Sequence, residues 1–334
     1  MLNRAQLVSV MLLVLFSLGS GARGADPASV LIFPLFDSSG VHETLITVTD
    51  TNDQNRSCED RSQEGDVIAE FVYIDGDSLG EYRVQEFMEP WDTLTVIASR
   101  HNPNFEKGYL YVLPRDPASG ALLAYDYFLG KAAVFPDGGS RAWSYRAFAL
   151  QAAEGHAPVG FGRCRRAFAD VDRDGQADFD GVEYESPVDG LVLPSFIQQD
   201  GAVNNRLVLL AFARRDAQIK YEITFWTNDS TRFRRTALLP TWWSGRLNEI
   251  TRFVENLGGD DQELPVVEQT GWVEFTGLRE QVPPTFRKED LLTSEGRPVA
   301  VIGVFMQYIE MRGYADGGAL ALTGDTPIRG FSFP

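Results

Sequence analysis

The sequence is poor in the residues that most enzymes use for catalysis. It has three histidines and two cysteines in 334 residues. We find no G-x-S-x-G nucleophile elbow, no H-E-x-x-H zinc motif, no P-loop and no dinucleotide-binding glycine fingerprint. His42, His101 and His156 lie beside predicted loops, so each is interpreted as a surface residue. Carboxylate pairs for glycoside hydrolysis stay open, because such pairs meet in space rather than in sequence.

Long apolar runs are also scarce. The run from Leu7 to Leu18 follows Arg4 and precedes small residues at positions 22 and 24. This pattern is typical of a secretory signal peptide, residues 1–24, cleaved before Ala25. No later segment reaches the roughly 18 apolar residues of a membrane span. We therefore expect an exported chain that is secreted, periplasmic or on the cell surface, without membrane insertion. An uncleaved N-terminal anchor is the alternative.

Positive charge is in short supply. The chain has 30 basic and 47 acidic residues, for a net charge of −17. An acidic surface of this kind repels nucleic acid and anionic membranes, which argues against both as partners. It is compatible with the calcium concentrations found outside cells. The expected partner is an unknown protein or glycan ligand.

The two cysteines, Cys58 and Cys164, form an even pair in a chain expected to be exported. In an oxidising compartment this predicts a disulfide. The bond would close a loop of about a hundred residues and stabilise the fold by about 4 kcal/mol in the chain-entropy model. Two free thiols are the alternative.

Strand signals dominate the rest of the chain. Short runs rich in Val, Ile, Leu, Phe and Tyr recur between turn signals such as Asp75-Gly76 and Asn228-Asp229. Ile219–Phe225 alternates apolar and polar residues, as a strand with one solvent-facing side does. No long amphipathic helix is predicted, and Leu247–Leu257 forms a short helical turn at most. The fold class is therefore all-β.

The segments of the first half recur in the same order in the second half, which predicts an internal repeat. Pro34 and Phe36, for example, recur as Pro194 and Phe196. The paired segments are Val30–Phe36 with Leu191–Phe196, Leu45–Val48 with Leu207–Leu210, Ala69–Tyr73 with Tyr221–Phe225, Pro90-Trp91 with Pro240–Trp242, Gly108–Leu110 with Gly271–Val273, and Leu122–Phe128 with Val299–Phe305.

We interpret this pattern as two tandem immunoglobulin-like β-sandwich repeats, at residues 25–150 and 190–334. Residues 151–189, rich in Gly, Arg and Asp, join them as a connector. A single continuous sandwich with accidental similarities is the alternative.

The connector holds the one stretch in which residue type and spacing demand a specific chemistry, D-V-D-R-D-G-Q-A-D. Carboxylates alternate along it, and Gly175 allows a sharp turn in a left-handed conformation. A hard cation with six to eight oxygen ligands fits such a loop, which favours calcium over magnesium or zinc. The predicted ligands are Asp170, Asp172, Asp174, the carbonyl of Gln176, and Asp178.

This loop resembles the calcium loops of EF-hands, dockerins and integrin-type repeats, over nine to twelve residues. It departs from the EF-hand at the twelfth position, where Gly181 replaces a bidentate Glu. Asp180 or Glu183 are candidates to substitute. The flanks do not resemble two helices, and Phe168 and Phe179 suggest a loop on a β-rich surface. An acidic, solvated turn without an ion is the alternative.

The tryptophans carry the last functional signal. Trp226 falls on the outward side of its predicted strand, where an indole can stack on a sugar ring. The leading interpretation is instead packing in the core and between the sandwiches. The leading functional hypothesis is accordingly a non-enzymatic protein of adhesion, surface assembly or ligand binding. The alternative is a carbohydrate-active protein, either a binding module or a glycosidase. The six tryptophans are Trp91, Trp143, Trp226, Trp242, Trp243 and Trp272.

Overall fold

Strands make up nearly all of the regular structure, as the sequence predicts, and every strand pair is antiparallel. The helix α2 (Ala98–His101) is a single turn, and Leu247, Glu249 and Ile250 are helical too. In the part of the chain described below, no helix is long and apolar enough to cross a membrane. The computed structural model describes residues 27–52, 66–136, 142–153, 158–159, 166–187, 190–198, 203–213, 217–227, 232–247, 249–250, 269–281, 299–309, 314–319 and 321–322.

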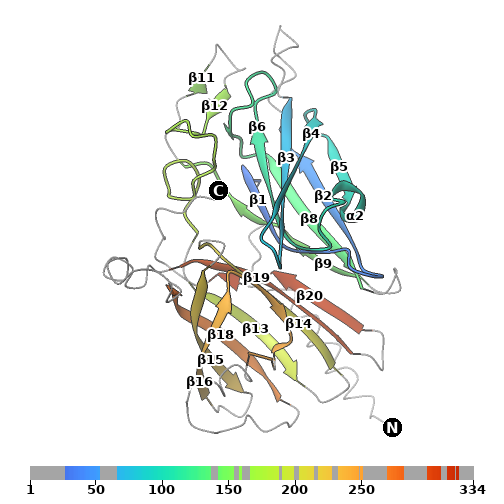
Figure 1. Ribbon diagram of the computed structural model, residues 1–334, viewed down its shortest axis with the longest axis vertical. Coiled ribbons are helices and arrows are strands. Elements are labelled where there is room, and N and C mark those ends of the chain that lie inside the picture. Colours follow the sequence, from blue (N-terminus) through green and yellow to red (C-terminus); the bar gives the residue numbers. More distant parts are fainter. Residues whose placement is uncertain are drawn as a thin grey trace, which may run out of the picture.

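The strands of the first half form two sheets that pack face to face, here called the first sandwich (Figure 1, blue to green). The five-stranded sheet has the order β10 (Phe148–Leu150), β1 (Val30–Asp37), β6 (Lys107–Arg115), β3 (Val67–Asp75), β4 (Glu81–Met88). The four-stranded sheet has the order β5 (Thr93–Ile97), β2 (Glu43–Asp50), β8 (Phe128–Phe135), β9 (Trp143–Arg146).

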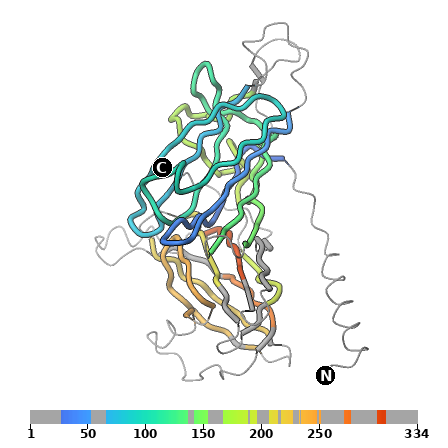
Figure 2. The backbone as a smooth tube through the Cα atoms, turned by 90° about the vertical axis from the view of Figure 1, so that its right-hand side faces the viewer, coloured from blue at the N-terminus to red at the C-terminus, as the bar shows by residue number. Residues whose placement is uncertain are grey.

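The strands of the second half form the second sandwich, which lies end to end with the first in both views (Figures 1 and 2). Its five-stranded sheet has the order β16 (Arg232–Pro240), β15 (Gln218–Thr227), β18 (Gln269–Gln281), β13 (Leu191–Gln198), β21 (Ala321–Leu322). Its four-stranded sheet has the order β17 (Trp242–Gly245), β14 (Val203–Ala211), β19 (Val301–Ile309), β20 (Tyr314–Ala319).

The two sandwiches share one strand order when strands are counted along each half and the two-residue β7 (Leu123–Ala124) is left out. They also share an irregularity. The pairing of β1 with β6 shifts between Phe33 and Phe36, and that of β13 with β18 shifts between Leu193 and Phe196. Each shift contains a proline, Pro34 or Pro194, whose missing N–H suits a bulge better than a regular ladder.

The four-stranded sheet of the second sandwich is buried on both faces, because side chains alternate along its strands. On β14, Leu207, Leu209 and Ala211 belong to the core of the second sandwich. Val208 and Leu210, on the opposite face, belong to the apolar cluster that includes the first sandwich. Because successive strand residues point to opposite faces, this one strand serves its own core and the contact between the sandwiches.

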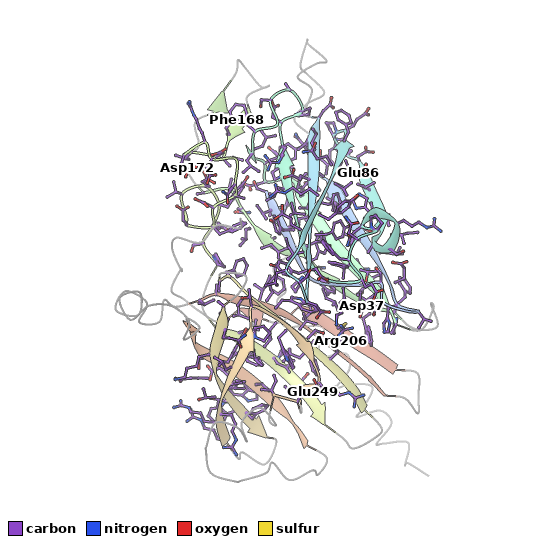
Figure 3. All side chains as sticks on the ribbon, in the orientation of Figure 1. Asp37, Glu86, Phe168, Asp172, Arg206 and Glu249 are labelled. Atoms are coloured by element: carbon purple, nitrogen blue, oxygen red, sulfur yellow. The ribbon has the colours of Figure 1, made fainter. Side chains whose placement is uncertain are left out.

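Specific bonds join the sandwiches where β1 meets this face. The Trp242 indole Nε1 donates to the Pro34 carbonyl at 2.8 Å. Arg206 and Asp37 form an ion pair at 2.5 Å, and both are labelled at the junction in Figure 3. Gly76 lies so close to the Trp242 ring that a Cβ there would overlap it. The neighbouring Trp243 points into the second core instead, since adjacent residues of an extended strand face opposite ways.

Candidate metal site

The acidic loop lies between β12 (Arg166–Phe168) and β13, beside a small sheet of β11 (Pro158–Val159), β12 and β7. Two buried aromatic residues fix it to the molecule. The Phe179 ring packs near Tyr184 and Phe212, with centroids at 6.0 and 6.2 Å. The Tyr184 hydroxyl donates to the Leu123 carbonyl at 3.1 Å. The two aromatic residues are themselves buried, whereas Asp172 and Asp174 are exposed to solvent.

Three of the predicted ligands come together. One oxygen each of Asp170, Asp172 and Asp174 lies within 4.8 Å of the other two. Of these residues, Asp170 has one carboxylate oxygen, Oδ1, that is buried and has no hydrogen-bond partner. A buried carboxylate oxygen without a donor is costly, and a cation at this position would compensate it.

Hydrogen bonds within the loop hold these carboxylates in place. Asp172 Oδ1 accepts from the Asp174 amide at 3.1 Å, and Asp174 Oδ1 accepts from the Gln176 amide at 2.7 Å. Asp170 Oδ2 accepts from the Gly175 amide at 3.0 Å. Gly175 has φ of +81°, the left-handed conformation predicted for it. Asp178 lies outside the group of three, and it and the Gln176 carbonyl remain predicted ligands.

Glu183 holds the two ends of the loop together. It is only 3% exposed. Its Oε1 accepts from the Val171 amide at 2.6 Å and its Oε2 from the Asp178 amide at 3.0 Å. Burial raises the pKa of this carboxyl, against the lowering effect of the two hydrogen bonds, and Asp178 and Asp170 raise it further. The sequence suggested Glu183 as a substitute ligand, but its position as a brace for backbone amides depends on the folded loop.

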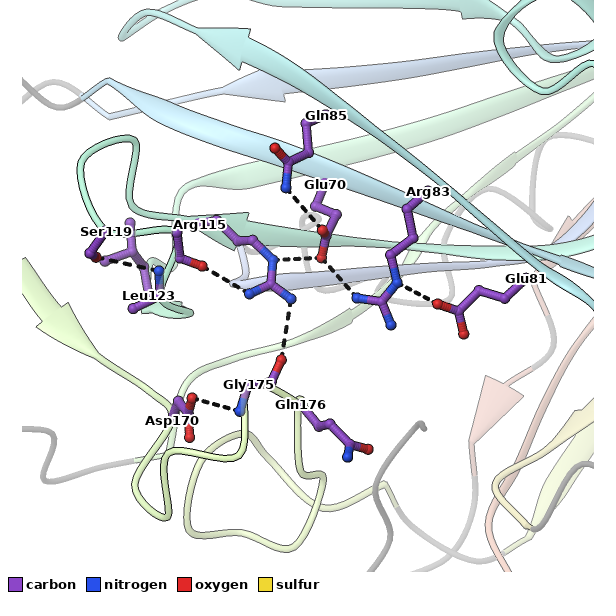
Figure 4. A network of polar contacts seen from close by, with 12 residues as sticks. Glu70, Glu81, Arg83, Gln85, Arg115, Ser119, Leu123, Asp170, Gly175 and Gln176 are labelled. Carbon is purple, nitrogen blue, oxygen red and sulfur yellow. Dashed lines mark hydrogen bonds and ion pairs between the residues drawn. The ribbon is translucent and has the colours of Figure 1, made fainter.

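A buried ion-pair network connects the loop to the first sandwich (Figure 4). Arg115 donates through Nη2 to the Gly175 carbonyl at 3.3 Å and through Nε to Glu70 at 2.6 Å. Glu70, 4% exposed, also accepts from Arg83 and Gln85. A buried carboxylate is tolerated when such donors surround it. The turn at Gly175 is thereby fixed against the outer face of the five-stranded sheet, the face away from the core of its sandwich. No motif in the sequence indicated this network.

The other candidate residues are placed as follows. Cys58, Cys164 and His156, like the predicted signal peptide, lie outside the described residues. The surface interpretation is wrong for His101, which hydrogen-bonds to the Tyr73 hydroxyl at 2.8 Å and to Glu86 at 3.2 Å. Its ring packs edge-on against Phe71, and burial lowers its pKa despite the carboxylate of Glu86, which raises it.

The three carboxylate oxygens that come together are donors of the kind that hard cations prefer, so these residues could hold such an ion. Comparison with known proteins assigns no family: no family model, curated protein or solved structure matches this chain.

Proposed function

We propose that this protein is an exported, calcium-stabilised β-sandwich protein without enzymatic activity, which acts by binding in adhesion, surface assembly or ligand capture. The observation that carries the calcium part is the group of Asp170, Asp172 and Asp174, together with the buried Oδ1 of Asp170 that lacks a donor. The position of the loop supports a structural role. Through Gly175 and Arg115, an ion there would stiffen the packing of the connector on the first sandwich.

Calcium-dependent stability tests this proposal. Calcium that binds only the folded state raises the free energy of unfolding by about 1.4 kcal/mol at a tenfold excess over Kd and about 2.7 at a hundredfold excess. We expect a Kd of about 10⁻⁴–10⁻³ M, as in extracellular modules. Asp172→Ala with Asp174→Ala is expected to abolish the rise in melting temperature that calcium causes.

The control removes the same charge elsewhere, with Asp77→Ala and Glu89→Ala, both on the exposed surface of the first sandwich. This variant keeps its response to calcium. Equal melting temperatures of the unmodified protein in chelator and in millimolar calcium, with no heat in titration calorimetry, would show that the loop is only an acidic turn.

We further propose that the sandwiches are two immunoglobulin-like repeats, at residues 25–150 and 190–334, joined by residues 151–189. The shared strand order and the proline bulge at the same place support this. Residues 190–334 expressed alone are expected to unfold cooperatively. Because they then expose Leu210 and Trp242, they are also expected to self-associate. A product without a cooperative transition would favour one intertwined domain.

Export and the Cys58–Cys164 disulfide belong to the same proposal and rest on the sequence. Mass mapping without reduction is expected to find the two cysteine peptides joined in protein secreted into an oxidising medium. Recovery of both as free thiols would exclude the bond.

A second candidate function, carbohydrate binding, is favoured by one observation. Trp226 and Trp272 stack in parallel on the surface of the second sandwich, with Trp272 exposed. Trp143, Trp242 and Trp243 are buried, as the packing interpretation predicts, whereas Trp91 and Trp272 are exposed.

A further inference from the structure

The outer face of the second five-stranded sheet carries a row of three stacked side chains. Trp226 on β15 lies opposite Trp272 on β18, with ring centroids 5.1 Å apart and planes 9° from parallel. On the other side of Trp226, Arg232 of β16 places its guanidinium carbon 4.7 Å from the ring centroid. Both faces of the Trp226 ring are therefore covered, one by an indole and one by a cation.

Trp272 ends this row on the side of β13. Although Trp226 covers its other face, Trp272 is still 36% exposed. The next strand, β13, makes its bulge at this level, where Pro194 and Ser195 are both exposed. The Trp272 indole is thus packed against Trp226 on one face and lies beside the exposed bulge of β13.

Polar side chains of both kinds lie on the same face of the sheet as this row. Glu274 follows Trp272 by two residues on the same face of β18, and it can accept hydrogen bonds. Arg234, exposed on β16, lies opposite Thr224, which in turn lies opposite Glu274, so a donor and an acceptor flank the same row. Such a mixture suits a ligand with many hydroxyl groups, each of which both donates and accepts.

The equivalent positions in the first sandwich lie in a contact surface. There, Ile74 of β3 lies opposite Tyr109 of β6, and both are fully buried. The second sandwich packs against this end of the sheet, with Trp242 bonded to the Pro34 carbonyl. In the second sandwich the corresponding row holds the tryptophan pair, and among the described residues nothing packs over Trp272 to the same extent. The exposed aromatic side chain thus lies at a position that is a contact in the first sandwich.

We propose that Trp272 is the stacking platform of a binding site for a neutral saccharide chain, with Trp226 and Arg232 as its support and Arg234 and Glu274 as hydroxyl partners. The C–H face of a pyranose ring packs on an indole, as other flat apolar surfaces do. Neutral chains are favoured because the net charge of −17 repels polyanions. This inference names the ligand of the binding role proposed above, and it does not depend on the calcium site.

A glycan array with neutral and acidic chains tests the inference, using the full chain in chelator and in calcium. Titration calorimetry with the strongest neutral chain follows, and Trp272→Ala is expected to weaken its binding at least tenfold. Trp272→Phe is expected to restore part of the affinity, because a smaller ring still stacks. Trp91→Gly is the matched control: this indole is also exposed, on the first sandwich, and its φ of +70° is one that glycine adopts freely. Its binding is expected to be unchanged.

Several results would overturn the site. These are binding of no neutral chain, binding of acidic chains or proteins only, or equal affinity of the unmodified protein and Trp272→Ala. If the protein binds glycan in chelator and its stability does not depend on calcium, the calcium proposal is wrong and the glycan site still holds. A calcium response without glycan binding would do the reverse.

Discussion

The two sandwiches have the same strand order, but equivalent faces differ in whether other parts of the molecule cover them. The outer face of the first five-stranded sheet is covered at one end by the acidic loop, through Arg115, and at the other by the second sandwich, through Trp242. The matching face of the second sandwich carries the exposed Trp272. One backbone arrangement thus serves as an internal contact in one half and as an open surface in the other, and the side chains decide which.

For the four-stranded sheets the difference is reversed: the outer face is exposed in the first sandwich and forms the contact in the second. When the core-facing Ile46 and Val48 of β2 are aligned with Leu207 and Leu209 of β14, the pair Thr49–Thr93 occupies the place of Leu210–Trp242. The threonine hydroxyls bond to each other at 3.1 Å on the surface. The Leu210–Trp242 pair is buried against the first sandwich. The contact between the sandwiches therefore depends on side chains that the first copy of this face lacks.

Removal of Trp242 is expected to have the largest effect on stability. Trp242→Ala takes away a buried indole and its bond to Pro34, at a cost of about 3–5 kcal/mol. Gly76→Ala is also expected to be destabilising, because its Cβ overlaps the indole. In the double variant the overlap is gone, so the two costs are less than additive. Urea unfolding of the four proteins measures this.

Trp243→Ala is the matched control, because this neighbouring indole lies in the second core and does not face Gly76. It is expected to be destabilising as well, but additive with Gly76→Ala. Equal coupling of Gly76 to both tryptophans would contradict the packing described here.

Loss of the ion pair across the junction is expected to have the next largest effect. Burial alone would raise the pKa of Asp37, but Arg206 and Ser39 lower it below its usual value. Arg206→Ala leaves a carboxylate that is 2% exposed without this cation, at a cost of about 1.5–3 kcal/mol at pH 7.

The pH dependence identifies the cause of this loss. Without Arg206, only the Ser39 hydrogen bonds oppose the effect of burial, so the pKa of Asp37 rises and the folded variant takes up a proton at a higher pH than the folded unmodified protein. The difference in unfolding free energy between the two proteins should then shrink as the pH falls from 7 to 4.5. A difference independent of pH would mean that lost packing, rather than charge, explains the effect.

The sequence predicted the strands well because their signals are local. Along Ile219–Phe225 the apolar residues are buried, and Lys220 and Glu222 are partly exposed, as the alternation predicts, although Thr224 is buried too. The prolines that paired the two halves both lie at bulges. The alignment of Leu45 with Leu207 was wrong by one residue, since Leu45 faces outward and Leu207 faces the core. A slip of one residue exchanges the two faces of a strand. Apolar composition alone does not specify which face meets a partner.

In the acidic loop, too, local features were predicted from the sequence and long-range contacts were not. The spacing of the aspartates and Gly175 is local, so the sequence located the turn and three carboxylates that come together. Arg115 and Glu70 belong to strands far away along the chain, and only pairing of β3 with β6 brings them to the loop. The Trp226–Trp272 stack likewise needs the register of β15 on β18.

A smaller effect is expected from a carboxyl group inside the first core. Asp50 is fully buried, where the alignment above puts Ala211 in the second core. Burial raises its pKa to about 6, although Tyr125 and Asn52 hydrogen-bond to it. As the pH falls from 7.5 to 5, the folded state gains a proton that the unfolded state, with a pKa near 4, does not. Stability should rise by about 1 kcal/mol from this group. Asp50→Asn should remove this component, as urea midpoints at both pH values will show; an unchanged pH dependence would contradict it.

The smallest effect is expected at the counterpart of Trp242. Thr93 is exposed, and its hydroxyl bonds to Thr49 across the surface ladder at 3.1 Å. Thr93→Val exchanges that bond for a methyl group of similar shape and good strand propensity, so the unfolding free energy should change by less than about 0.5 kcal/mol. The same measurement on Trp242→Ala gives the contrast, since both residues hold the same ladder position. A loss above 1 kcal/mol at Thr93 would mean that this face is also covered, and that the two sandwiches differ less than their side chains indicate.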